Sequence, residues 1–341
     1  MSAKVRRRVA VVTDSVANLP QALARSLRVW VVPLLVVFRD KVFRDGVDLS
    51  PAQFYRRLRE GQVASTSQPN PDAFLEAYQA AVKSSASAEP AESILVITIS
   101  SKLSGTFHSA TQAAQRFSSA AVRVIDSLTA SFAEGWLVTE AARLAERGAS
   151  LGEVADRVLA LREKVRIFAA VDSLDYLRRS GRIGRAVAMA GSLLKVKPIL
   201  TVGRDGVAEG VDRARTLERA LDRLVEFVAE DAPQLVPTAR TAQATAGGRA
   251  TEGSAQDAGE ERGRGFQPQQ VGAPESGRGP LLHAAVVHAD ALEAAHALRR
   301  RLIERFRCAE LFLEYITPVL GAHAGPGTTG VAYWWEQEAT S

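Results

Sequence analysis

The chain has one cysteine, few aromatic residues and no long apolar run. Cys308 is the single cysteine among 341 residues, and Phe, Trp and Tyr together make up 6% of the chain. One thiol cannot form an intramolecular disulfide or a thiolate metal cluster, so we expect no metal site and a reducing, cytoplasmic location. The basic residues 1–8 lead into too short an apolar segment for a signal peptide, and no stretch has the length of a membrane span.

Acidic residues are missing from one segment. Residues 178–197 hold six cations, whereas the other 37 bases, 43 less these six, are balanced by 38 acids. The net charge of +5 is therefore a local patch and does not indicate a generally basic protein. The six cations are Arg178, Arg179, Arg182, Arg185, Lys195 and Lys197.

The first half of the chain alternates short β-branched runs with helical patterns. We predict strands at 9–12, 30–37, 94–99 and 122–125, and helices at 71–84, 106–117 and 131–147. This alternation is typical of a doubly wound, mostly parallel α/β sheet, which we assign to residues 8–164. In such sheets ligands bind beyond the carboxyl ends of strands. Three predicted strands end in Asp-Ser, at Asp14, Asp126 and Asp172, although helix capping explains these pairs equally well.

The second half reads as an α+β domain, residues 165–341. Its predicted strands lie at 167–171, 198–202, 284–287, 311–315 and 330–334, and its helices at 214–229 and 292–306. With 46% hydrophobic residues and this length, we expect two domains. Residues 231–280 are rich in Ala, Gly, Gln, Arg, Thr and Pro, and such a segment buries too little apolar surface to offset its ordering entropy. We predict a disordered insertion there.

Three polar turns are candidates for one binding site. Residues 100–106, Ser-Ser-Lys-Leu-Ser-Gly-Thr, follow a predicted strand and precede a predicted helix. The first amides of a helix lack intrahelical partners and favour anions, although Ser and Thr at such a place are most often plain caps. Residues 66–71, Thr-Ser-Gln-Pro-Asn-Pro, and 323–328, His-Ala-Gly-Pro-Gly-Thr, add hydroxyls, glycines and an imidazole.

These turns occur in the order of a known family. Together with Val-Val-Thr-Asp-Ser at 11–15, Val-Ile-Asp-Ser at 124–127 and the segment 174–183, they resemble the DegV family of fatty-acid-binding proteins. The resemblance implies a carrier that encloses a long-chain fatty acid such as palmitate near the junction of the two domains. It also implies that Thr66 and Ser104 bind the carboxylate of the fatty acid.

The same loops offer further donors for that carboxylate. Ser67 and Gly105 can donate through backbone amides, and His323 through an imidazole nitrogen. About fifteen methylene groups at ~0.8 kcal/mol each give an upper figure of roughly 10 kcal/mol, so the tail should dominate affinity. Candidates for the tunnel wall, although such residues are more often ordinary core, are Phe107, Phe132, Ile167, Val187, Met189, Ala190, Leu193, Leu194 and Ile199.

The resemblance also implies a partner, a separate ATP-dependent fatty acid kinase that phosphorylates the exposed carboxylate. The chain has no phosphate-binding loop of its own, so we predict a lipid-binding carrier and no catalytic residue or cofactor. Arg178, Arg179 and Arg182 could stabilise the acyl-phosphate or dock an acidic surface of the kinase. A solvated cationic face is the simpler interpretation of the same residues.

Two other functions are open at this stage. Ser104 and His323, with Asp14 or Asp126 as orienting group, would suit a serine hydrolase of acyl esters, although no Gly-x-Ser-x-Gly elbow is present. The basic segment could instead contact nucleic acid or an anionic membrane. Without a helix-turn-helix signature or interleaved aromatics, we expect no nucleic acid and at most transient membrane contact.

Overall fold

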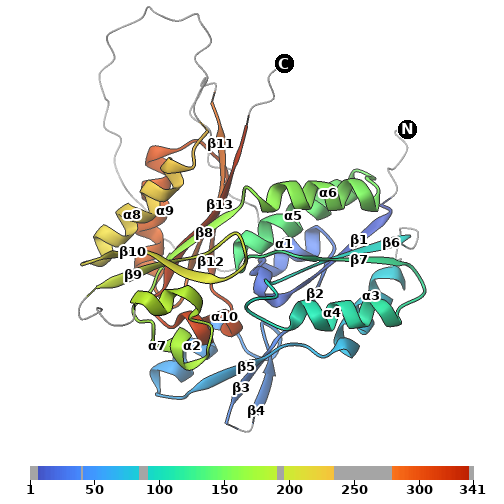
Figure 1. The fold of residues 1–341 in the computed structure, drawn as a ribbon, viewed down its shortest axis with the longest axis horizontal. Helices are drawn as coiled ribbons and strands as arrows, with labels where there is room; N and C mark the ends of the chain where they lie inside the picture. The colour runs from blue at the N-terminus through green and yellow to red at the C-terminus, as the bar shows by residue number, and fades with distance from the viewer. Residues whose placement is uncertain (1–6, 40, 84–90, 190–195, 234–278, 338–341) are drawn as a thin grey trace, which may run out of the picture.

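The computed structural model describes residues 7–39, 41–83, 91–189, 196–233 and 279–337. Two large sheets, each with helices packed on it, lie next to each other, and a small third sheet lies beside their junction (Figure 1). Within the described residues the longest helix has 15 residues, and no helix is long and apolar enough to cross a membrane.

The first large sheet is parallel, with strand order β2-β1-β6-β7. Because side chains alternate along a strand, Val9 and Val11 of its central strand face one apolar cluster and Ala10 and Val12 face another. Helices cover both faces, which confirms the predicted doubly wound α/β arrangement. The elements are β1 (Val9–Asp14), η1 (Ser15–Ala17), α1 (Gln21–Ser26), β2 (Val29–Val32), α3 (Pro71–Lys83), β6 (Ser93–Thr98), α4 (Thr106–Arg116), β7 (Ala121–Asp126), α5 (Phe132–Glu146) and α6 (Leu151–Arg162).

The second large sheet is mixed, with strand order β10-β9-β8-β13-β11-β12, in which only β11 and β12 are parallel. Two helices, α8 and α9, pack on one face of it. The elements of this half are β8 (Arg166–Ala170), α7 (Asp175–Arg179), η2 (Gly184–Met189), β9 (Lys197–Val202), β10 (Ala208–Ala214), α8 (Leu217–Glu230), β11 (Leu281–His288), α9 (Leu292–Arg305), β12 (Cys308–Tyr315), α10 (Pro318–Ala324) and β13 (Thr329–Glu336).

Helix α5 packs between the two large sheets. Trp136 on this helix is fully buried and donates through its indole nitrogen to the backbone oxygen of Ala332 in β13 (3.1 Å). Phe132, one turn earlier, stacks on Phe312 of β12 with ring centroids 5.1 Å apart. The largest apolar cluster therefore contains residues of both sheets. The boundary that we predict between residues 164 and 165 stays a prediction.

The predicted strand at 30–37 is wrong, because the chain turns at Pro33. Proline has no N–H for a sheet ladder, and β2 ends at Val32. The next strand belongs to a separate antiparallel sheet with order β4-β3-β5, packed against α2. Ser50 and Gln53 form a capping box at the start of α2. The elements are β3 (Leu35–Phe38), β4 (Lys41–Arg44), α2 (Pro51–Arg59) and β5 (Ala64–Ser67).

Other predicted strands and helices match within a few residues at each end. Several elements have no counterpart among the predicted ones, namely η1, α1, β4, α2, β5, α6, α7, η2, β10 and α10. Of the predicted insertion at 231–280, all but residues 231–233 and 279–280 lies outside the described residues. Disorder in that segment stays a prediction.

Candidate functional site

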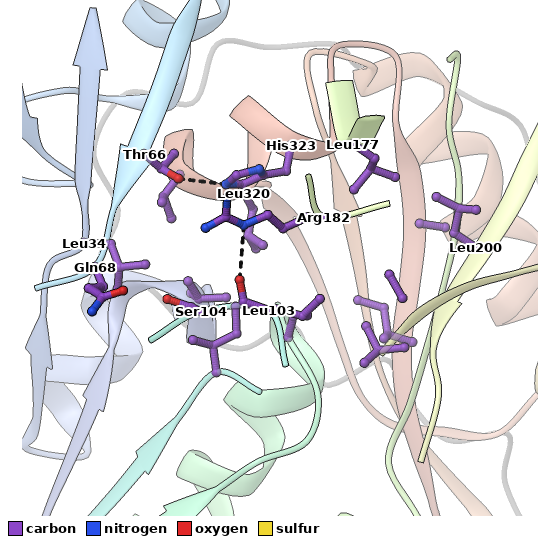
Figure 2. A pocket seen from close by; sticks show the side chains of 18 of the residues that line it. Leu34, Thr66, Gln68, Leu103, Ser104, Leu177, Arg182, Leu200, Leu320 and His323 are labelled. Carbon is purple, nitrogen blue, oxygen red and sulfur yellow. Dashed lines mark hydrogen bonds between the residues drawn. The ribbon is translucent and has the colours of Figure 1, made fainter. Parts of the chain in front are cut away.

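The three polar turns predicted from the sequence meet at one cavity. It lies where the small sheet, the loop before α4, the second large sheet and α10 come together (Figure 2). One end is lined by polar side chains, namely Thr66, Ser67, Gln68, Ser104, Arg182 and His323. Most of the remaining wall is apolar and includes Leu34, Ile99, Leu103, Ile167, Leu200 and Leu320. A polar end joined to an apolar wall suits an amphiphilic ligand.

Thr66 and His323 contact each other across the polar end. Thr66 lies on β5, and His323 lies near the end of α10, 257 positions later. The Thr66 hydroxyl oxygen and His323 Nε2 are 2.8 Å apart (Figure 2). Leu320, one helical turn before His323, presents its side chain to the same cavity.

The surroundings of His323 determine its protonation. Burial lowers its pKa to about 4, and the positive charge of Arg182 acts in the same direction. The ring is therefore neutral near pH 7, with one N–H. Its Nδ1 is buried without a hydrogen-bond partner among the described residues, and an unpaired acceptor costs less than an unpaired N–H. We assign the proton to Nε2, which then donates to Thr66 and leaves the threonine hydrogen free for another acceptor.

Ser104 and Gly105 lie at the start of α4. The Ser104 hydroxyl is 2.8 Å from that of Thr106 and accepts from the Thr106 amide at 3.3 Å. Gly105 is the N-cap residue and does not line the cavity. A Cβ at this position would overlap the side-chain amide of Gln68, so glycine allows the Gln68 turn to approach α4 closely. Gln68 itself was missed in the sequence, although it lies in the same polar turn as Thr66.

The basic segment divides into residues at the cavity and residues away from it. Arg182 lines the cavity, and its Nε donates to the backbone oxygen of Leu103 at 3.3 Å (Figure 2). Arg178 instead pairs with Asp175 on its own helix (2.9 Å), and Arg179 lies over the Tyr176 ring. Of the three arginines predicted to act together, only Arg182 lines this cavity.

Acids from distant parts of the chain neutralise two more cations of this segment. Arg185 pairs with Asp205 (2.7 Å) and Glu209 (3.0 Å), and Lys197 pairs with Asp172 (2.6 Å). Lys195 lies outside the described residues. The patch that is free of acids in sequence is therefore partly neutralised in the fold.

Among the candidates for the tunnel wall, Ile167 lines the cavity. Phe132 and Ile199 are fully buried in apolar clusters and do not line the cavity, and Val187 is 57% exposed. Phe107 and Met189 do not line the cavity. The other three, Ala190, Leu193 and Leu194, lie outside the described residues.

The hydrogen bonds do not form the triad of a serine hydrolase. Ser104 pairs with Thr106, and His323 pairs with Thr66, so the nucleophile and base that we considered have other partners. Asp14 accepts from the amides of Val16 (2.8 Å) and Ile99 (2.9 Å). Asp126 accepts from the amides of Ser101 and Leu128. These two carboxylates organise loops, and no described carboxylate orients His323.

Comparison with known proteins identifies the family. A family model described as "Uncharacterised protein, DegV family" matches residues 8–264. The chain belongs to the DegV family. A DegV domain-containing protein of Streptomyces coelicolor is 32% identical over 326 residues, which cover 95% of this chain and 98% of that protein.

Solved structures of DegV proteins share the fold. A DegV family protein from Thermus thermophilus, whose structure is described as showing fatty acid binding, has a TM-score of 0.76 at 30% identity. The match covers 96% of this chain and 99% of that one. DegV of Bacillus subtilis, described as a fatty acid binding protein, also has a TM-score of 0.76, at 28% identity over 97% and 100% of the two chains. The predicted family and fold class are confirmed.

Proposed function

We propose that this DegV protein binds one long-chain fatty acid in the cavity and acts as a carrier without an active site of its own. The observation that carries the proposal is the joining of three distant polar turns at one end of an apolar cavity. The related proteins of Thermus thermophilus and Bacillus subtilis, which bind fatty acids, support the assignment of ligand class.

In this proposal the carboxylate lies between Thr66 and Ser104. The Thr66 hydroxyl can donate to it because His323 already donates to the Thr66 oxygen, so His323 acts through Thr66. The amide of Ser67 is a further donor, whereas Gly105, which was also predicted to donate, does not line the cavity. Hydrogen bonds to an ionised group are the stronger kind. The alkyl chain lies against Ile167 and Leu200, away from water.

Recovery of the natural ligand tests the proposal directly. The protein is purified from a bacterial host, extracted with organic solvent, and the extract is analysed by mass spectrometry. We expect about one long-chain fatty acid per chain, and the identity of that acid defines its length and unsaturation. Repeated recovery of protein without bound lipid, together with no binding of added palmitate, would refute the proposal.

We further propose that the carrier works in the cytoplasm and presents the carboxylate to a separate ATP-dependent kinase. Arg182 is the cation best placed to balance the added charge of an acyl-phosphate, because it lines the polar end of the cavity. In a transfer assay with a bacterial fatty acid kinase and ATP, Arg182→Ala should reduce acyl-phosphate formation about tenfold. Arg178→Ala, which removes an exposed cation paired with Asp175, is the matched control. Equal effects of both variants would contradict the role of Arg182.

A further inference from the structure

The small sheet and α10 each carry one partner of the Thr66–His323 contact. Thr66 is on β5, and His323 is on α10. A second polar contact joins the same two units, because the amide of Val319, in the first turn of α10, donates to Asp45 Oδ1 at 3.3 Å. Asp45 directly follows β4 of the small sheet. The two contacts lie at opposite ends of the seven-residue helix.

The Asp45 carboxyl group is buried. The residue is 2% exposed, and its backbone amide donates to the Leu34 oxygen at 2.9 Å. Its second carboxyl oxygen, Oδ2, is buried and makes no hydrogen bond of ordinary geometry with any residue that the structure describes. A buried carboxyl group is costly unless it is well paired. An apolar side chain would fill this site at lower cost, so the carboxyl group needs an explanation.

Close packing on α2 makes α10 a short, stiff unit, so a shift of its first turn is transmitted to its last turn. Tyr55 on α2 donates to the Ile316 oxygen at 3.0 Å, just before α10 begins. Gly321, in the middle of α10, has no Cβ, and a Cβ there would overlap the Tyr55 hydroxyl. The helix therefore lies directly against α2, and its orientation depends on what holds its first turn.

We propose that Asp45 is a positioning residue of the head-group site, which holds the first turn of α10 and thereby keeps His323 against Thr66. This role rests on the proposed binding of a fatty acid. It assigns Asp45 to recognition of the carboxylate, although 21 positions and a helix separate it from Thr66 in the sequence, and it predicts no contact between Asp45 and the ligand.

The groups that surround Asp45 come from two further parts of the chain. Burial opposes the ionised form of Asp45, whereas the hydroxyls of Ser15 and Thr317 and the amide of Val319 favour it. Burial has the largest effect and raises the pKa of Asp45 to about 7. The contact with Val319 requires only that residue 45 presents an oxygen that accepts a hydrogen bond. The amide oxygen of an asparagine can do this in place of the carboxylate oxygen of Asp45.

The test compares binding of palmitate with binding of hexadecanol, an alcohol of equal length, to Asp45→Ala and Asp45→Asn. We expect the preference for acid over alcohol to fall about tenfold in Asp45→Ala, with less than about twofold change for the alcohol. Asp45→Asn keeps an acceptor for the Val319 amide and should retain the preference within about threefold. The imidazole N–H signal of His323 in NMR spectra should shift in Asp45→Ala and stay near its wild-type position in Asp45→Asn.

Asp48→Ala is the matched control, because Asp48 lies in the same turn and pairs with the exposed Arg44. An unchanged acid preference in Asp45→Ala, or an equal loss for acid and alcohol, would overturn the proposal. If Asp45→Ala does not fold, Asp45→Ser, which is too short to reach Val319, gives the same comparison. Failure of the wild-type protein to bind either lipid would refute the proposed function instead.

Discussion

The polar and the apolar ends of the cavity are built from different kinds of structure. The polar end consists of side chains from the end of β5, two loops and one short helix, each held by a few hydrogen bonds such as that between Thr66 and His323. The apolar end includes a wall of strand residues from the second large sheet, among them Ile167 and Leu200. Hydrogen bonds discriminate between chemical groups, whereas buried area provides affinity with little discrimination. A ligand held by both ends is therefore bound through its tail and selected by its head.

A charge in the apolar end should give the largest effect. Leu200 is 7% exposed, and Leu200→Asp would place a carboxylate among apolar side chains, which cannot solvate its charge. We expect binding of both palmitate and hexadecanol to weaken at least about a hundredfold, measured by displacement of a fluorescent fatty acid. Val211→Asp on the neighbouring strand β10, where the side chain is 41% exposed, should change binding less than about twofold. Wild-type affinity in Leu200→Asp would show that the tail lies elsewhere.

Removal of both hydroxyls should affect only the head of the ligand. The double variant Thr66→Ala, Ser104→Ala loses two donors to the carboxylate, so palmitate binding should weaken about thirtyfold while hexadecanol binding stays almost unchanged. Isothermal titration with each lipid measures the difference. Thr111→Ala, which removes a hydroxyl bonded to the Phe107 oxygen on α4, is the control. If the double variant binds palmitate and hexadecanol equally weakly, the hydroxyls do not act on the head of the ligand alone, and the proposed division between the two ends is wrong.

The smallest effect concerns pH and the histidine. The pKa of His323 is about 4 in the fold, whereas an exposed histidine has a value of about 6.5. Between these values the unfolded chain binds more protons, so the contribution of His323 to stability is complete above pH 6.5 and is lost as pH falls to about 4. The difference in unfolding free energy between wild type and His323→Gln should therefore decrease by about 1–2 kcal/mol over this range, after allowance for partial exposure of the ring.

Urea unfolding at several pH values measures this difference. The same pKa predicts that the acid preference of the wild type changes less than about twofold between pH 6.5 and 8, because His323 stays neutral. An increase in the stability difference on acidification would mean that the ring is protonated in the fold. Asp45 and Asp14, which have raised pKa values, affect wild type and His323→Gln alike, and their contributions cancel in the difference.

The polar end was predictable from the sequence, because each turn carries its residue types within six or seven neighbouring positions. Thr66, Ser104 and His323 stand in hydroxyl- and glycine-rich segments whose composition differs from that of core elements. The apolar end was not predictable in the same way. Ile167 lines the cavity and Phe132 fills the core, yet both are large apolar residues in regular elements, and only the packing separates them.

Errors in the fold prediction had local physical causes. The run at 30–37 is apolar throughout and half β-branched, and Pro33 divides it between two separate sheets. The contact between Asp45 and Val319 joins residues 274 positions apart, and no local sequence pattern predicts such a contact. The sequence could not distinguish Arg178 from Arg182, because both lie in one basic segment. In the fold Arg178 pairs with Asp175, whereas Arg182 lines the cavity.

The placement of α5 between the two large sheets has a consequence for how the molecule is made. Trp136 and Phe132 are anchored to β12 and β13, which are synthesised about 180 residues later. Until those strands emerge from the ribosome, the apolar face of α5 that they will cover is exposed to solvent. The first 164 residues should therefore be prone to aggregation if they are expressed alone. Co-expression of the two halves as separate fragments should therefore yield more soluble material than either half by itself.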